Sequence, residues 1–283
     1  MVCRLLILLL YIAYDRNVSK RKAYDLSPRT SLLHFFPAGD SIAPLIILYS
    51  VLMTPRVTLM IPTMNGRDHL ETCLASLEQL EYPRNNLQVV VVDNASRDDT
   101  VDFVKKSFPW VQVQSNETNL GFAPALNQAC RDVQSDYLAF LNNDTRVEPD
   151  WLSRLVDVLE SSAGRRESIA AACGAILDWD GLGVQFFGGY INLNGKAFHD
   201  TFSPEDLGSA LAVQPTLYAC GAGMVIRTQV FLESGGFDDD YFMIYEDVDL
   251  GWRLNILGFR SALVRDARMY HHESASLKSL DYT

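Results

Sequence analysis

The chain has 283 residues, 48% of them hydrophobic, and its 24 basic and 35 acidic side chains give a formal net charge of −11. This length allows one large hydrophobic core, or one core and a small subdomain. The acidic balance argues against a nucleic-acid partner, because binding a phosphate backbone needs clustered Lys and Arg. The five cysteines are scattered without a CxxC spacing, which argues against a zinc site or a disulfide framework and favours a reducing, cytosolic setting.

Residues 1–55 are predicted to be an extension outside the folded domain. They contain two apolar runs, 5–12 and 42–53, each shorter than the roughly 20 residues that cross a bilayer as a helix. The first run resembles a signal-peptide core, but no small-residue cleavage site follows it. Three basic residues at 20–22 would favour the cytosolic side if this run inserted. We expect a cytoplasmic protein whose extension is unrelated to the domain or touches the inner face of the membrane peripherally.

From residue 57 onward, predicted strands alternate with amphipathic helices. The first strand is rich in β-branched residues and stops at Pro62, and the helix after it has leucines at helical spacing. The predicted strands are 57–61, 87–92, 111–114 and 137–141, and the predicted helices are 69–80, 100–108, 124–133 and 149–162. This alternation predicts an α/β fold with βαβ units and a mostly parallel sheet.

Beyond residue 169 the alternation loosens. Strand-like runs at 170–177 and 184–187 precede a hairpin candidate at 190–199, which is centred on Asn194-Gly195. A short helix at 228–234 is closed by Gly235-Gly236. We expect mixed strands and loops here, which complete the sheet and form the second wall of a cleft.

The predicted strand at 137–141 ends in Asn142-Asn143-Asp144-Thr145, which places a carboxylate just past its C-terminal end. In open α/β sheets, ligands bind at this edge. Asp144, with Asn142 two residues before it, can hold a hard divalent cation that keeps room for phosphate oxygens and water. Taken alone, the same residues more often form a simple turn with side-chain caps.

Asp93 ends the second predicted strand at the same edge. A carboxylate there can accept the imide N–H of a uracil or thymine ring. The alternative is an Asx turn, because residues 93–99 are rich in turn formers. Pro62, Thr63 and Asn65 close the first strand at this edge, where their backbone could line a pocket for the base.

An aromatic and apolar run at 242–245 leads into Glu246 and Asp247, at the start of a predicted helix that reaches about residue 257. The helix macrodipole stabilises acidic residues in a first turn by roughly 0.3–1 kcal/mol, so capping is one explanation. Three acidic residues within four positions exceed what capping needs. A carboxylate fixed at a helix start beside a cleft makes a good general base.

His271 and His272 follow a strand-like run at 262–264 after a short link. Either imidazole could complete a metal site begun by Asp144, if the fold brings them together. A histidine pair near a terminus is more often solvated surface.

Six motifs follow one another along the chain: Ile61-Pro62-Thr63, Val91-Val92-Asp93-Asn94-Ala95-Ser96, Asn119-Leu120-Gly121-Phe122-Ala123, Leu141-Asn142-Asn143-Asp144, Gly235-Gly236-Phe237-Asp238 and Glu246-Asp247-Val248-Asp249. Together they resemble the family 2 inverting glycosyltransferases of the GT-A fold, and among these the bacterial rhamnosyltransferase-like branch. The resemblance covers about residues 57–276. It implies a Rossmann-like sheet flanked by helices, with a nucleotide-binding half at 56–150. The half at 151–283 would be mixed and would bind the acceptor, and relatives commonly continue beyond it.

The resemblance implies a role for each motif. Asp247 matches the catalytic base, and Glu246 would support acceptor binding or orient the base. Asp144 and His271 match ligands of Mg²⁺ or Mn²⁺, with His272 the next candidate. Asn142 replaces the first Asp of the family's metal-binding motif, which weakens the expected metal affinity. The implied donor-binding residues are Pro62, Thr63, Asn65, Asp93, Asn119, Gly121, Phe122, Asn142 and Asn143.

The implied reaction moves a sugar from a dTDP- or UDP-linked donor to a hydroxyl of a glycan or lipid-linked acceptor, in the synthesis of a cell-envelope polysaccharide. One alternative is a degenerate, nucleotide-sugar-binding scaffold protein, because Asn142 and Pro124 depart from the family pattern; the intact Glu246-Asp247 pair argues against it. Another is a Rossmann dehydrogenase, which is disfavoured because no Gly-x-Gly-x-x-Gly follows the first strand.

Overall fold

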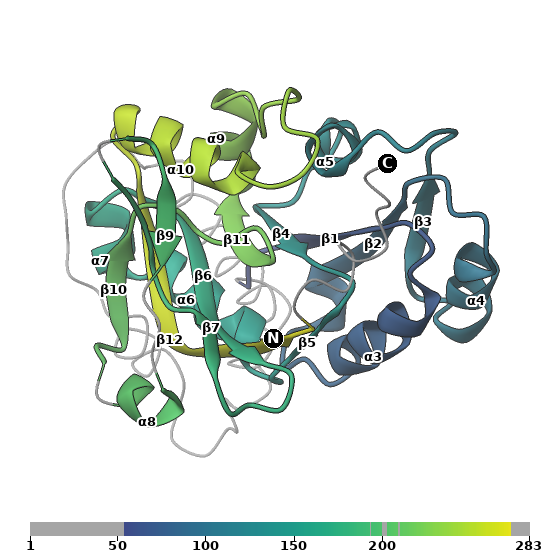
Figure 1. The fold of residues 1–283 in the computed structure, drawn as a ribbon, viewed down its shortest axis with the longest axis horizontal. Helices are drawn as coiled ribbons and strands as arrows, with labels where there is room; N and C mark the ends of the chain where they lie inside the picture. Colours follow the sequence, from purple (N-terminus) through teal and green to yellow (C-terminus); the bar gives the residue numbers. More distant parts are fainter. Residues whose placement is uncertain (1–53, 193, 200–202, 209, 273–283) are drawn as a thin grey trace, which may run out of the picture. The chain divides into compact units, whose positions relative to one another are not determined.

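One mixed sheet forms the centre of the part of the chain that the structure describes (Figure 1). The computed structural model describes residues 54–192, 194–199, 203–208 and 210–272. Within these residues the sheet has ten strands in the order β10-β12-β6-β11-β4-β1-β2-β3, with β5 beside β12 and β7 beside β6. Its strands are β1 (Val57–Thr63), β2 (Leu87–Asp93), β3 (Gln112–Ser115), β4 (Tyr137–Leu141), β5 (Thr145–Val147), β6 (Ile169–Asp178), β7 (Val184–Phe186), β10 (Val213–Thr216), β11 (Gly223–Arg227) and β12 (Arg260–His271). The predicted α/β class is confirmed.

β1 pairs in parallel with both β2 and β4, and β2 with β3, as the alternation of strands and helices predicted. β4 is buried at all of its five positions. A strand covered on both faces can be apolar throughout, which explains its unbroken hydrophobic run. Because parallel strands end at the same edge of a sheet, the residues after β1, β2 and β4 are brought together there.

The other half of the sheet is mixed. β11 is antiparallel to both β4 and β6, whereas β6 and β12 are parallel. The register of β12 against β6 shifts between Val264 and Arg268, and β12 then continues until His271 lies opposite Thr145 of β5. The predicted strand was confined to 262–264, because the charged residues that follow interrupt the apolar pattern. The short link expected before His271 is therefore part of a strand.

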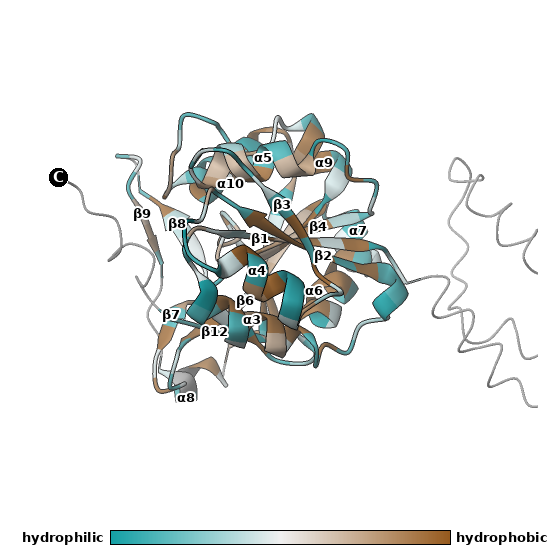
Figure 2. Ribbon diagram, turned by 90° about the vertical axis from the view of Figure 1, so that its right-hand side faces the viewer, coloured by the Kyte–Doolittle hydropathy of each residue, from teal (hydrophilic) through white to brown (hydrophobic). Residues whose placement is uncertain are grey.

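Helices cover both faces of the sheet. Figure 2 shows α5, α9 and α10 on one side and α3, α4 and α6 on the other. The rings of Phe140, Phe231 and Phe237 pack on the first side with centroids 5.0 to 5.2 Å apart. The helices are α3 (Arg67–Leu77), α4 (Thr100–Ser107), α5 (Phe122–Cys130), α6 (Trp151–Glu160), α7 (Ser162–Arg166), α8 (Pro204–Leu207), α9 (Thr228–Glu233) and α10 (Glu246–Ile256), with a 3-10 turn, η2, at Arg84–Asn86. The predicted hairpin is confirmed as β8 (Gly189–Ile191) and β9 (Ala197–His199).

Pro62 lies inside β1 and does not end it, because the strand continues to Thr63. The Thr63 carbonyl accepts a 2.8 Å hydrogen bond from the N–H of Asn94, on the β2 side. Alternation along the strand then turns the Pro62 nitrogen toward β4, and the pairing of β1 with β4 stops at Met60. Proline therefore removes no ladder hydrogen bond at this position. The helix predicted from Pro149 likewise begins later, at Trp151.

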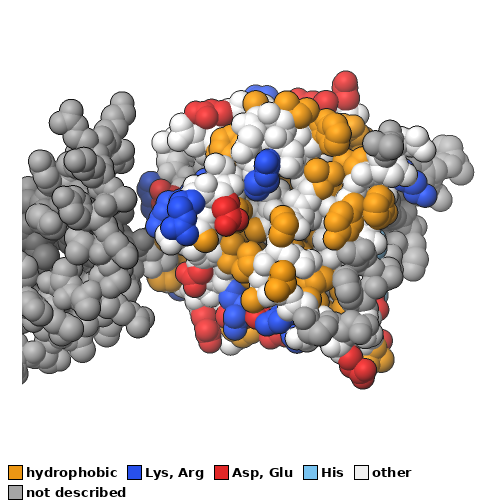
Figure 3. Space-filling view, turned by 90° about the vertical axis from the view of Figure 1, so that its left-hand side faces the viewer, with side chains coloured by type: hydrophobic (Ala, Val, Ile, Leu, Met, Phe, Trp, Pro, Cys, Tyr) orange, Lys and Arg blue, Asp and Glu red, His pale blue; other side chains and the backbone are white. Residues whose placement is uncertain are grey.

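The expected N-terminal extension, with its membrane contact, lies almost wholly outside the described residues and stays a prediction. In the part of the chain that the structure describes, no helix is long and apolar enough to span a bilayer. Apolar side chains do reach the surface, and Figure 3 shows them on one face in small groups separated by polar atoms. On α10, Trp252 and Ile256 are exposed. Single exposed apolar side chains are normal on protein surfaces.

Candidate active site

Three predicted site segments meet at the edge where the parallel strands end. The amide of Asn143, after β4, donates a 2.9 Å hydrogen bond to the Thr63 hydroxyl at the end of β1. Both side chains are buried. A Cβ atom on Gly66 would lie 2.3 Å from each of the two bonded atoms, so a larger residue there would displace this hydrogen-bonded pair. The backbone at Gly66 therefore lies against the Asn143–Thr63 hydrogen bond, which links the ends of β1 and β4.

Asp93 is 3% exposed at the end of β2, and its Oδ1 accepts a 3.1 Å hydrogen bond from the N–H of Ser96. The Asp93 side chain thus caps a local turn, although its bond reaches three residues on and not the two of the Asx turn considered from the sequence. Asn65 joins the same turn, since its N–H donates to the Ser96 hydroxyl at 2.8 Å and its Oδ1 accepts from the N–H of Arg97 at 2.8 Å. The turn fixes Asp93 beside Asn65, where the sequence placed a base pocket.

The loop at 119–122 is held from two sides. Asn94 donates to the Gly121 carbonyl at 2.7 Å, and Asn119 accepts from the Gly121 N–H at 3.0 Å. The N–H of Phe122 donates to the carbonyl of Phe242 at 2.7 Å. Gly121 has a φ of +89° and its missing Cβ would lie 2.7 Å from Phe242. This contact joins the loop to the segment that leads into α10.

Asp144 and His271 lie side by side, as the sequence predicted. Nε2 of His271 is 3.2 Å from Oδ1 of Asp144, but the two atoms are not aligned as a hydrogen bond, and the buried Oδ1 has no donor among the described residues. The amide nitrogen of Asn142 lies 3.5 Å from the same Nε2. On the other side of the ring, Nδ1 is 3.0 Å from Oε1 of Gln185. His272 points elsewhere, with its ring 5.3 Å from that of Trp179.

This arrangement fits a divalent cation. A ligating histidine usually donates its second N–H to an oxygen acceptor, and Gln185 takes that place. Nε2 then faces the undonated oxygen of Asp144 and the amide of Asn142. In the described part of the chain no group of three or more His, Cys, Asp and Glu side chains could hold a metal. Two protein ligands suit Mg²⁺ or Mn²⁺, which take remaining oxygens from phosphates and water.

Asp247 lies at the start of α10 with both oxygens satisfied. The N–H of Gly221 donates to Oδ2 and the N–H of Val248 to Oδ1, each at 2.8 Å. Burial raises the pKa of Asp247, while these N–H donors lower it. Ile244 and Tyr245 just before it have φ values of +73° and +76°. Such values are rare for a β-branched residue, and strain of this kind gathers at functional sites.

Glu246 is 7% exposed, and its Oε2 has no hydrogen-bond partner among the described residues. Burial, and next the charge of Asp247, raise the pKa of Glu246 to about 8. A Cβ atom on Gly221 would lie 3.3 Å from Oε1 of Glu246 and 3.4 Å from Cβ of Asp247. The two acidic side chains therefore pack against the same short backbone segment before β11.

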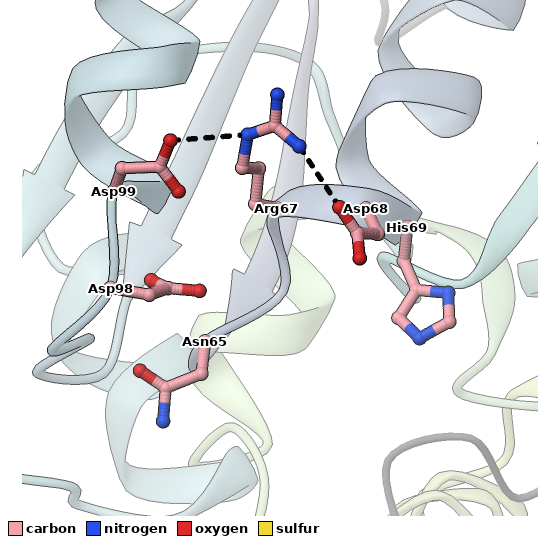
Figure 4. Close-up of a pocket in the computed structure, with 6 residues that line it drawn as sticks. All are labelled: Asn65, Arg67, Asp68, His69, Asp98 and Asp99. Carbon is pink, nitrogen blue, oxygen red and sulfur yellow. Dashed lines mark hydrogen bonds and ion pairs between the residues drawn. The ribbon is translucent and has the colours of Figure 1, made fainter.

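A separate hollow of about 340 Å³ opens beside the Asn65 turn (Figure 4). Its lining residues are Asn65, Arg67, Asp68, His69, Asp98 and Asp99. Arg67 reaches both Asp68, at 3.0 Å, and Asp99, at 3.2 Å. The ring of His69 is 6.1 Å from that of His272, the residue after His271.

Two protein-family models match parts of the chain. A model described as Glycosyl transferase family group 2 matches residues 137–281, about half of the chain. The chain is a family 2 glycosyltransferase. A second model, described as Glycosyl transferase family 2, matches residues 58–170 of this glycosyltransferase, which include the ends of β1, β2 and β4.

Two relatives of the glycosyltransferase differ in length. It is 32% identical over 245 residues to the O-antigen biosynthesis protein RfbC of Myxococcus xanthus. The aligned region covers 82% of this chain and 18% of RfbC. It is 28% identical over 248 residues to an N-acetylglucosaminyl-diphospho-decaprenol L-rhamnosyltransferase of Mycobacterium tuberculosis. This aligned region covers 79% of this chain and 78% of the relative. The chain thus spans less than a fifth of RfbC.

Solved structures confirm the GT-A fold. GalNAc-T7 with UDP, GalNAc and Mn²⁺ matches with a TM-score of 0.63 at 17% identity, over 78% of this chain and 44% of that one. Residues 1–349 of TarS from S. aureus, in complex with UDP-GlcNAc, match with a TM-score of 0.58 at 20% identity, over 80% and 61%. At these identities the similarity concerns the fold of the glycosyltransferase.

Sequence reasoning missed several residues around the site of this glycosyltransferase. Gln185 orients His271, Asn94 ties the end of β2 to the Gly121 loop, and Phe242 packs on that loop. Gln185 is a single polar residue in a short strand, so no pattern marks it. Gly221 was missed as well, and its N–H donates to Asp247.

Proposed function

We propose that this glycosyltransferase moves a sugar from a nucleoside diphosphate-sugar to an acceptor hydroxyl with inversion at the anomeric carbon. The observation that carries the proposal is Asp247, a carboxylate held by two backbone N–H groups at the start of α10, behind a strained segment. Fixing both oxygens sets the direction from which Asp247 can take a proton. Structures of similar fold that contain UDP with Mn²⁺ or UDP-GlcNAc support such a donor.

The donor would lie along the edge formed by the ends of β1, β2 and β4. Asp93 would accept the imide N–H of a uracil or thymine ring, and Thr63 and Asn65 would line the base pocket. Asn119, Gly121 and Phe122 would form the loop over the donor. The remaining expected contacts are Pro62, Asn142 and Asn143.

Asp144 and His271 would hold Mg²⁺ or Mn²⁺, with Asn142 beside them. When bound, the ion supplies Lewis-acid chemistry, since it neutralises charge that develops on the leaving diphosphate. Gln185 would keep the His271 ring in place through Nδ1. No protein acid would then be needed to protonate the leaving group, and Asp247 acting as a base would be enough.

Asp247 would take the proton of the acceptor hydroxyl while that oxygen attacks the anomeric carbon in line, opposite the diphosphate. The new bond joins the acceptor oxygen to the anomeric carbon. The bond from that carbon to the diphosphate oxygen breaks, and its electron pair leaves with the diphosphate. Glycoside hydrolases instead use an acid and a second carboxylate on the sugar.

The acceptor would be a glycan or a lipid-linked sugar of a cell-envelope polysaccharide. Two relatives are named for O-antigen biosynthesis and for rhamnosyl transfer to N-acetylglucosaminyl-diphospho-decaprenol, which supports this class of pathway. The assembled Asp247 and Asp144–His271 pair argue against a non-catalytic scaffold, despite the departures at Asn142 and Pro124.

The test is Asp247→Asn, which keeps the shape of the side chain and removes its basicity. Loss of a general base lowers the rate by about 10²–10⁴-fold, and we expect this loss in diphosphate release with a polyprenyl-diphosphate-linked N-acetylglucosamine as the acceptor probe. Donor binding, followed by calorimetry, should stay within a few-fold of wild type. Asp240→Asn, which changes an exposed carboxylate in the segment before α10, serves as the control. Loss of donor binding in Asp247→Asn would give Asp247 a structural role instead.

A further inference from the structure

The two acidic residues that begin α10 lie in unequal surroundings. Asp247 accepts N–H hydrogen bonds at both oxygens, from Gly221 and Val248. Glu246 is more than nine-tenths buried, and the part of the chain that the structure describes offers no partner for its Oε2. Hydrogen bonds from N–H groups favour the charged form of a carboxylate, and burial without a partner favours the neutral form.

The groups around Glu246 supply no positive charge to offset its burial. They are Asp247 on α10 and Cys220 on the segment before β11, and Cys220 in turn neighbours Cys173 on β6. Asp249, one turn on, has its own partner in Arg253 at 2.7 Å. The N–H groups of Glu246 and Ile244 favour the ionised form of Glu246, but they weigh less than burial and the charge of Asp247.

We propose that Glu246 holds a proton at neutral pH, so that the Glu246–Asp247 pair carries one negative charge, which lies on Asp247. This inference rests on the proposed function, in which Asp247 is the base. Glu246 then acts through Asp247, as a positioning residue. Because its side chain is neutral, the site holds no second buried charge, and Asp247 is the ionised carboxylate of the pair. When Asp247 takes the acceptor proton, both side chains are neutral until that proton leaves to solvent.

The proposal has a consequence for stability. Burial and the Asp247 charge raise the pKa of Glu246 from 4.5 to about 8, so between these values the folded state keeps a proton that the unfolded state has lost. The contribution of Glu246 to stability is therefore largest below pH 4.5, is lost progressively as the pH rises through 8, and is smallest above it. A neutral glutamine at this position would remove that dependence.

The experiment compares the melting temperatures of wild type and Glu246→Gln between pH 5 and pH 9. We expect the variant to gain on wild type as the pH rises, by roughly 5 °C or more over this range. Glu71→Gln, at an exposed position on α3, should show a constant difference from wild type and serves as the matched control. A Glu246→Gln difference that is also constant with pH would overturn the proposal.

A second measurement detects the proton itself. A protonated carboxyl group absorbs in the infrared apart from a carboxylate, so the spectrum of wild type minus that of Glu246→Gln should show a protonated-carboxyl band at pH 7. The band should disappear by about pH 10. A carboxylate band at pH 7 would overturn the proposal. Neither experiment requires sugar transfer, so an active Asp247→Asn variant would overturn the proposed base and leave this test unaffected.

Discussion

At the scale of single residues, the proposed metal site is a chain of polar contacts. His271 faces Asp144 through Nε2 and Gln185 through Nδ1, and the Gln185 amide nitrogen donates to Asp178 and to the His271 carbonyl, each at 3.0 Å. Asp144 and His271 could be predicted from the sequence, because they match motif positions of a known family. Gln185 could not, because it becomes important only when β7 pairs with β6 beside the end of β12.

Gln185→Leu tests whether this contact serves a metal. Leucine keeps the volume but cannot accept from Nδ1, so the imidazole would no longer be held, and we expect Mn²⁺ affinity to fall by about 10–100-fold. Titration of Mn²⁺ by electron paramagnetic resonance gives the affinity directly. Gln88→Leu, at an exposed glutamine of β2 that bonds Gln112, is the control and should bind Mn²⁺ as wild type does. Equal affinities in the two variants would show that Gln185 plays no part.

At the scale of elements, the loop at 119–122 and the segment before α10 are joined through Gly121 and Phe242. The contact combines a hydrogen bond from Phe122 to the Phe242 carbonyl with a backbone approach that only glycine permits. It links the proposed donor loop to the helix start that carries Asp247. The sequence predicted both segments separately. It gave no sign of their contact, since 120 residues of chain lie between them and the pairing depends on how α5 and α10 sit on one face of the sheet.

Gly121→Ala should weaken this contact between the two segments. Gly195→Ala is the matched control, which separates the cost of backbone strain from the cost of the clash with Phe242. Both glycines have positive φ, +89° and +77°, but a Cβ atom at Gly195 would meet nothing within 4 Å. Backbone strain alone costs about 1–2 kcal/mol for a left-handed non-glycine residue. We therefore expect a loss of that size for Gly195→Ala and a larger one, about 2–4 kcal/mol, for Gly121→Ala, measured by urea unfolding. Losses of equal size would mean that Phe242 moves aside without penalty.

At the scale of the whole molecule, the two halves of the sheet differed in how far they could be predicted. The parallel half has unbroken apolar strands separated by amphipathic helices, so its elements were visible in the periodicity, although their ends were off by a few residues. In the other half, β5, β10 and β11 were not predicted and β12 was cut short. β5 and β10 are only three and four residues long, and β12 carries charged residues at positions where it is irregular. That irregular strand brings His271 to Asp144.

The measurement that tests the central claim most directly is thermal unfolding with nucleotides, with and without Mn²⁺. A ligand that binds only the folded state adds about 2.7 kcal/mol of stability at a hundredfold excess over its dissociation constant. We predict a clear rise in melting temperature with UDP or dTDP compounds when Mn²⁺ is present, little without it, and none with ADP or NAD. A metal-independent rise, or no rise with any of these ligands, would contradict a metal-assisted nucleotide-sugar site in this glycosyltransferase.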